Sequence, residues 1–170
     1  MDLYIEIARN AIKGYLIDEE LPETTNLPRE ILTKKGACFV SLHKGDELRG
    51  CIGTIMPVCK NIAAEIMYNA AQACLDPRFT PVTKEELNSL KVKVDILSDP
   101  EPVGDKTKLD PKKYGLIVKA PDGRSGVLLP DLDGVNMIDK QIDIAREKAG
   151  ILSDEAIYMY RFTVDRHEEK

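Results

Sequence analysis

Two apolar runs flank a tight-turn signal in residues 37–55, which read ACFVSLHKGDELRGCIGTI. The dipeptide Gly45-Asp46 between the runs is typical of a two-residue hairpin loop. The segment therefore predicts an antiparallel β-hairpin. Its second strand contains LRGCIG, residues 48–53. Glycine inside a strand often marks a bulge or a close approach by another part of the chain, so this strand is where we look first for a functional site.

A two-residue loop also predicts the register of the hairpin. The expected pairs are Cys51 with Val40, Arg49 with Leu42 and Gly53 with Cys38. Because Arg49, Cys51 and Gly53 occupy alternate positions, we expect them on one face of the strand. A cation beside a thiol favours the thiolate, which is the nucleophilic form. Cys51 is therefore a candidate catalytic thiol, and Arg49 is a candidate anion binder.

Cys51 has a second, purely structural interpretation. Free cysteine is among the most buried residue types and packs as a small hydrophobic side chain; Arg49 would then pair with an acidic side chain. A disulfide with Cys38 is not expected, because diagonal neighbours lie about 7–8 Å apart while bonded cysteines have Cβ atoms about 3.5–4.5 Å apart. His43 is predicted on the face opposite Cys51, which leaves the thiol without a histidine partner.

The rest of the chain predicts an alternation of helices and strands. Apolar periodicity predicts helices at 3–17, 57–76 and about 136–149, a helical turn at 29–34, and a capping box opening a short helix at 83–86. Strands are predicted at 90–97 and 156–164, and a second hairpin at 115–130, after a loop at 98–115. The order hairpin, helix, strand occurs twice. Antiparallel strands with segregated helices indicate an α+β fold.

The composition narrows the class of protein. The 170 residues are 43% hydrophobic and 31% charged, which is typical of a soluble globular protein. The net charge of −5 argues against nucleic-acid binding, which needs a basic footprint. The sequence has no apolar run near the roughly 18 residues of a membrane span and no signal peptide at its start. Four cysteines without a Cys-x-x-Cys pair favour reduced thiols in the cytoplasm, and predict neither a metal site nor a cofactor.

The motif LRGCIG, following the strand GACFVSL, resembles the signature of the AMMECR-type domain family. Further similar segments follow in order, namely DPRFTPVTKEELNSLKVKVDILS (76–98), YGLIVKAPDGRSGVLLPDL (114–132) and REKAG (146–150). The resemblance implies one AMMECR-type domain over residues 1–170, with sub-lobes at about 1–98 and 99–170. It implies two β3-α2-like units that form one barrel-like, mixed or antiparallel sheet, with the helices packed outside.

The same resemblance implies site residues and partners. Carried over by position, the motif residues are Leu48, Arg49, Gly50, Cys51, Ile52 and Gly53, followed by Asp76, Pro77, Arg78 and Phe79. Prokaryotic members are associated with Memo-like and radical-SAM proteins in the AmmeMemoRadiSam system. The implied function is thus an accessory module that binds such a partner. The alternative is a thiol-dependent enzyme with Cys51 in a cleft and Arg49 binding a small anionic substrate.

The segment Asp76-Pro77-Arg78-Phe79 has two interpretations of its own. In the first, Asp-Pro ends the preceding helix and Phe79 fills the core, since proline is common after a helix C-terminus. In the second, Arg78 lies at a cleft and binds an anion in the bidentate way typical of arginine.

Overall fold

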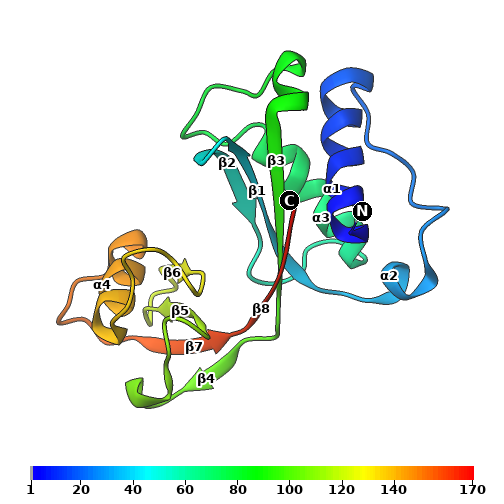
Figure 1. Ribbon diagram of the computed structural model, residues 1–170. Helices are drawn as coiled ribbons and strands as arrows, with labels where there is room; N and C mark the ends of the chain where they lie inside the picture. The colour runs from blue at the N-terminus through cyan, green and yellow to red at the C-terminus, as the bar shows by residue number, and fades with distance from the viewer. Residues whose placement is uncertain (1) are drawn as a thin grey trace. The chain divides into compact units, whose positions relative to one another are not determined.

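The computed structural model describes residues 2–170, which contain two four-stranded sheets (Figure 1). Residues up to Leu97 together with Asp165–Lys170 form the first compact unit, and Ser98–Val164 form the second. The α+β class is confirmed. The strands form two sheets, however, and not the one barrel-like sheet that the resemblance implies.

The first sheet contains two strands of the predicted hairpin and two strands from later in the chain. Its members are β1 (Ala37–Lys44), β2 (Glu47–Gly53), β3 (Leu90–Leu97) and β8 (Val164–Glu168), in the order β2-β1-β3-β8. β1 pairs antiparallel with both β2 and β3. The predicted hairpin with Gly45-Asp46 as its loop, and the predicted strand at 90–97, are thus confirmed.

Helices of the first unit supply its core with apolar side chains. They are α1 (Leu3–Lys13), the π-helical η1 (Gly14–Asp18), α2 (Arg29–Thr33), α3 (Ile62–Ala73) and the 3-10 helix η2 (Lys84–Ser89). The core combines their buried side chains with Val40, Leu42 and Val94 of the sheet. The capping box at Thr83 and Glu86 is present as predicted.

α3 begins later than the sequence pattern predicts. The helix was expected from Pro57 onward, but residues 54–61 form an irregular loop and α3 starts after Asn61. The Asn61 side chain accepts a hydrogen bond from the backbone N–H of Ala64 at 2.9 Å. An asparagine in this position is a strong helix N-cap, which explains why the helix begins here.

The second unit contains α4 (Ile138–Ala149), the 3-10 helix η3 (Lys106–Lys108) and the strands β4 (Glu101–Val103), β5 (Gly115–Lys119), β6 (Ser125–Leu128) and β7 (Tyr158–Phe162). The sheet order is β4-β7-β5-β6. Two sequence predictions need correction. The predicted loop at 98–115 contains β4, and the predicted last strand is divided between β7 and β8. No helix within residues 2–170 is long and apolar enough to cross a membrane.

The two units repeat one topology, and a strand from the end of the chain completes the first sheet. In each, a hairpin, a helix and a third strand follow in sequence, and the third strand pairs with the first strand of the hairpin: β2-β1-β3 and β6-β5-β7. β4 follows β3 in sequence but belongs to the second sheet, and β8 follows β7 but belongs to the first. The first sheet is therefore completed by β8 from the end of the chain, whereas the strands of the second sheet all lie within Ser98–Val164.

Candidate functional site

A β-bulge at Arg49 interrupts the hairpin that carries the motif. Near the turn, His43 pairs with Leu48, as a two-residue loop predicts. The register then shifts, and Leu42 pairs with Gly50. Arg49 is thus the extra residue of the bulge, which bends a strand and redirects its side chains.

Beyond the bulge, the predicted pairs are wrong. Cys51 pairs with Ser41 in place of Val40, and Gly53 pairs with Phe39 in place of Cys38. Because side chains alternate along β1, His43 lies on the same sheet face as Ser41 and Cys51. The prediction that His43 faces away from Cys51 is therefore also wrong.

The Cys51 thiol lies half-buried in a polar environment. Ser41 Oγ donates to Cys51 Sγ at 3.5 Å. Burial raises the pKa of the thiol, although the Ser41 hydrogen bond and the charge of Arg78 oppose this, and the carboxylates of Asp95 and Asp76 raise it further. The thiol is therefore protonated at neutral pH and is a weak nucleophile in this state.

Asp76 and Arg78 hold the backbone of Cys51 from the open edge of β2. Asp76 Oδ2 accepts the Cys51 N–H at 2.9 Å, and Arg78 Nη2 donates to the Cys51 carbonyl at 3.4 Å. The two side chains also bind each other, with Arg78 Nε and Nη2 at 3.1 and 2.7 Å from the Asp76 carboxylate oxygens. We call these contacts the backbone clamp. It satisfies edge-strand groups that have no neighbouring strand.

The electrostatics of the clamp follow from its burial. The Asp76 side chain is 2% exposed, whereas that of Arg78 is 59% exposed. The hydrogen bond from Arg78, with further bonds from the backbone of Cys51 and Arg78, lowers the pKa of Asp76 to about 2. The clamp is thus fully ionised at neutral pH.

Arg49 binds a carboxylate and two carbonyls of its own chain. Its Nε and Nη2 atoms donate to Glu86 Oε1 and Oε2 at 2.9 and 3.0 Å. Nη1 and Nη2 also donate to the carbonyls of Thr80 and Pro81. Arg49 thereby lowers the pKa of Glu86 to about 2. These bonds fasten residues 80–86 to β2, and the cation that acts on the Cys51 thiol is Arg78.

The motif glycines make room for close packing. A Cβ at Gly50 would overlap the carbonyl oxygen of Ala73 in α3, and a Cβ at Gly53 would overlap the ring of Phe39. Gly50 thus admits a helix, which is one of the readings that the sequence allows for glycine in a strand. Gly53 admits the aromatic ring of its cross-strand neighbour.

The other motif residues lie around the clamp. Ile52 pairs with Val40 and packs against the core of the first unit. Leu48 is 37% exposed. Phe79 is half-buried, and the Arg78 guanidinium lies 5.6 Å from its ring centre. Of the two interpretations of the Asp76–Phe79 segment, neither is observed in full: α3 ends at Ala73, before the Asp76 at which it was predicted to stop, and Arg78 lies beside Cys51 with Asp76 as its anion.

The second unit provides an internal comparison for this site. Gly126 of β6 corresponds to Gly50, because a Cβ there would also overlap a helix carbonyl, that of Ala145. The next residue, Val127, corresponds to Cys51, and its carbonyl accepts a hydrogen bond from Lys148 Nζ at 2.9 Å. The glycine and the cationic cap therefore recur in both units. The thiol is found in one unit alone and is not a requirement of the topology.

Two polar residues at this end of the hairpin were not among the sequence candidates. Ser41 contacts the thiol, and the fully buried Glu65 accepts hydrogen bonds from the loop after β2. A signal for Glu65 was available, because it is the only charged residue of α3, IAAEIMYNAAQA. Ser41 gave no signal, since its contact depends on the register shift.

The described residues hold their cysteines as free thiols. Cys38 and Cys74 are buried, and Cys51 and Cys59 are partly exposed. Within residues 2–170, no group of three or more His, Cys, Asp and Glu side chains is placed to hold a metal ion.

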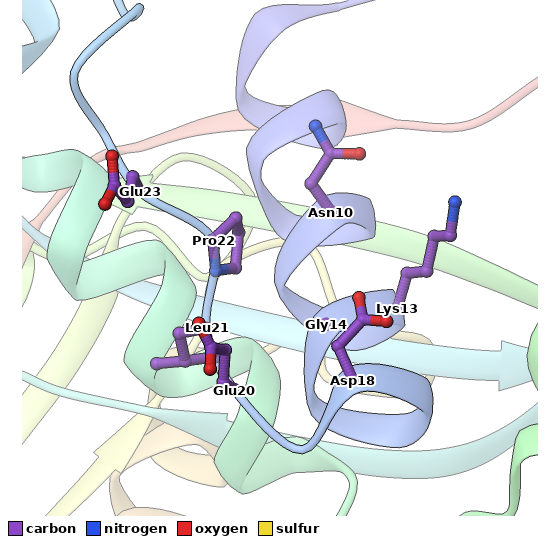
Figure 2. Close-up of a pocket in the computed structure, with 8 residues that line it drawn as sticks. All are labelled: Asn10, Lys13, Gly14, Asp18, Glu20, Leu21, Pro22 and Glu23. Atoms are coloured by element: carbon purple, nitrogen blue, oxygen red, sulfur yellow. The ribbon is translucent and has the colours of Figure 1, made fainter.

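A separate surface hollow of about 410 Å³ lies where α1 ends (Figure 2). The segment after η1 runs beside the helix end, where Gly14 leaves room for the Glu20 carbonyl and the Pro22 ring. The charged side chains that line the hollow are exposed and of both signs, including Lys13 and Asp18. They offer no buried polar group that would select a ligand.

Comparison with known proteins gives one family. The AMMECR1 family matches residues 5–167. A protein of Thermotoga maritima is 46% identical over 169 residues, covering 97% of both chains. The Clostridium acetobutylicum protein CA_C1420 is 47% identical over 174 residues, which cover 99% of this chain but 36% of that protein. The chain thus spans about a third of the Clostridium protein.

A solved structure has the same fold. The crystal structure of the uncharacterized protein PH0010 from Pyrococcus horikoshii superposes with a TM-score of 0.90 and 30% sequence identity. The match covers 98% of this chain and 90% of that chain.

Proposed function

The chain belongs to the AMMECR1 family, and from this premise we propose that it is a cytoplasmic protein-binding module whose partner is a Memo-like or a radical-SAM protein. In this function the LRGCIG and Asp76–Phe79 motifs hold the hairpin in one shape. The free state of all four cysteines is compatible with a reducing compartment.

One observation carries the proposal. Both motif arginines already bind carboxylates of their own chain, Arg49 with Glu86 and Arg78 with Asp76. Arg49 is 14% exposed and donates through all three of its nitrogens. A guanidinium bound in this way would have to break these bonds before it could bind an anionic substrate. This favours a structural role for Arg49.

The length of the Clostridium relative supports a domain that functions together with other protein domains. That protein carries the matched domain within a chain nearly three times as long. In that relative, the domain is therefore covalently joined to further residues outside the match. A module that works beside a partner has this property.

The proposal is tested by titrating the purified chain against a Memo-like protein and, separately, a radical-SAM protein encoded in the same genome. Isothermal titration calorimetry should give saturable binding to at least one of them. A complex should also elute as one species in gel filtration. The absence of heat and of co-elution with both proteins would reject the module.

A thiol-dependent enzyme is the second candidate, and one observation favours it. The pair Ser41–Cys51 is polar, whereas the corresponding pair of the second unit, Ile117–Val127, is apolar. The pH dependence of iodoacetamide labelling, measured for each cysteine by peptide mass spectrometry, separates the two functions. The labelling rate follows the thiolate fraction and levels off above the thiol pKa, so for the module we expect the rate at Cys51 to be still rising at pH 9, the ordinary thiol value. Fast labelling well below that pH would favour the enzyme.

A further inference from the structure

A histidine of β8 lies between two carboxylates at the start of α1. His167 Nδ1 is 2.7 Å from Asp2 Oδ2 and forms a hydrogen bond with it. His167 Nε2 is 3.0 Å from Asp165 Oδ2, an ion-pair contact without the alignment of a hydrogen bond. The ring of Tyr4 meets the imidazole edge-on, with 4.6 Å between the ring centres. Both nitrogens of a side chain that is only 16% exposed therefore face a carboxylate.

Asp2 connects this histidine to the first turn of the helix. Its Oδ1 accepts the backbone N–H groups of Tyr4 and Ile5 at 2.9 and 3.3 Å, so Asp2 is the N-cap of α1. Its second oxygen, Oδ2, binds His167. One carboxylate thus holds both the start of α1 and a side chain of β8. We call Asp2, Asp165 and His167 the histidine bridge.

The histidine bridge requires a doubly protonated imidazole ring. An ionised carboxylate only accepts hydrogen bonds, and a neutral imidazole has one N–H group and one lone pair. In either neutral tautomer, a nitrogen lone pair would face a carboxylate oxygen at 2.7 or 3.0 Å. The imidazolium ion carries a proton on each nitrogen and removes this repulsion. Histidine gains or loses its second proton between about pH 5 and pH 8.

The charges around the bridge favour the protonated ring. Burial lowers the pKa of His167, but the contacts with Asp2 and Asp165 outweigh it, and the pKa lies above the ordinary 6.5. The first turn of α1 also carries Glu6. The other charged groups lie around the adjoining surface hollow, and they are Arg9, Lys91, Glu168, Glu169 and Lys170. Two of these are neutralised in ion pairs, Glu169 with Arg9 and Glu168 with Lys93.

We propose that the histidine bridge is a pH-sensitive contact, which fastens β8 to the start of α1 while His167 is protonated and opens when the ring becomes neutral. β8 is the strand that completes the first sheet, and it follows β7 after one residue. The ion pairs Glu169–Arg9 and Arg166–Asp95 remain at higher pH. We therefore expect β8 to loosen and not to detach. The proposal is independent of the partner-binding function.

The sign of the pH dependence follows from the raised pKa of His167. A group whose pKa is higher in the folded chain stabilises the fold fully below its unfolded value and loses this contribution as the pH rises through the folded value. The bridge should therefore be closed below pH 6.5 and open at alkaline pH.

The two histidines of the chain make the test selective. Histidine-ring NMR of the full chain, from about pH 5 to pH 9, gives a titration midpoint for each ring. His43 is the internal control, because burial and the charge of Lys93 lower its pKa. We expect His167 to titrate above pH 6.5 and His43 below it. D2N keeps a good N-cap residue, and it should lower the midpoint of His167 without moving that of His43.

Hydrogen exchange, corrected for its intrinsic pH dependence, then measures how firmly β8 is held. Partly exposed ion pairs contribute weakly, so the protection of the β8 amides should fall about two- to fivefold between about pH 6 and pH 8.5. The amides of β1 should keep their protection. H167Q should show the weaker β8 protection at every pH, and H43Q should behave like the wild type.

Three results would overturn the proposal. The first is a His167 midpoint at or below that of His43. The second is β8 protection in the wild type that stays constant across the His167 titration. The third is full pH dependence in D2N, because Asp165 of the same strand would then be the partner and nothing would fasten β8 to α1.

Discussion

Some residues of the LRGCIG motif contribute to stability because they lack a side chain and so allow close packing. Gly50 is the sharpest case, because a Cβ there would meet the backbone of α3 rather than a flexible side chain. We expect G50A to lower the free energy of unfolding by at least about 2 kcal/mol, since overpacking forces backbone shifts. Urea unfolding followed by circular dichroism measures the change.

The control for this prediction is G104A. A Cβ at Gly104 meets nothing within 4 Å, so we expect the free energy of unfolding of G104A to lie within about 0.5 kcal/mol of the wild-type value. Equal stability of G50A and the wild type would show that α3 can move away from β2, and the structural reading of this glycine would then be wrong.

The clamp carboxylate predicts a stability that depends on acid pH. Arg78 and two backbone N–H groups lower the pKa of Asp76 from 3.8 to about 2. A lowered native pKa stabilises the fold above the unfolded value, and the contribution is lost as pH falls from 3.8 towards about 2. We therefore expect D76N to cost about 1.5–3 kcal/mol at pH 7 and to lose less stability than the wild type between pH 4 and pH 2. Urea unfolding at both pH values checks this. A loss on acidification equal to that of the wild type would mean that the clamp does not titrate in this range.

At the scale of elements, the sequence predicts most helices and strands but not the contacts between them. The hairpin, the strand at 90–97 and the helices follow from local periodicity and turn residues. The bulge at Arg49 does not, because its side chain is bound by Thr80, Pro81 and Glu86, more than thirty positions away in sequence. One shifted residue moved every later pair, and with it the face on which His43 was predicted.

The candidate site was predicted in its parts and not in its assembly. LRGCIG and Asp76–Phe79 both carried visible signals, yet the clamp joins Cys51 and Asp76 across 25 positions. No local pattern encodes such a contact. The predicted role of Arg49 beside the thiol rested on strict alternation, which the bulge removes; Arg78 occupies that place.

Glu65 of α3 and Gln141 of α4 are each the fourth residue of their helix, and their opposite hydrogen-bonding roles make a prediction. Glu65 accepts backbone N–H groups, whereas Gln141 donates to a carbonyl. E65Q turns an amide towards donors and Q141E turns a carboxylate towards an acceptor, so each should cost about 1–3 kcal/mol. E65Q should increase the hydrogen-exchange rates of the Val58 and Cys59 backbone amides and leave the exchange rates in β5 and β6 unchanged. Tolerance of E65Q with slow exchange at both amides would contradict this role of Glu65.

Over the whole molecule, β8 makes the first sheet depend on both halves of the sequence. The fourth strand of the first sheet follows β7 after one residue, Thr163, and the fourth strand of the second sheet follows β3 after residues 98–100. The second unit is one continuous piece of chain, Ser98–Val164, whereas the first unit also needs Asp165–Lys170. Cooperative units often coincide with continuous motifs, but the last strand of the first sheet continues from β7 after Thr163 alone, so we expect the two sheets to unfold together.

R166M tests this dependence between the sheets. Arg166 of β8 donates through Nε and Nη2 to Asp95 of β3, at 2.8 and 3.3 Å, and the Asp95 side chain is 2% exposed. Removing the cation leaves a buried carboxylate uncompensated, which costs about 3–5 kcal/mol. Because β8 continues directly from β7, we expect the urea midpoint of the second sheet to fall together with that of the first. Hydrogen exchange of β1, β3, β5 and β7 in increasing urea resolves the sheets separately, with R29M, on the exposed surface of α2, as the control. A lower midpoint in the first sheet alone would show that β8 does not transmit stability from one half of the chain to the other.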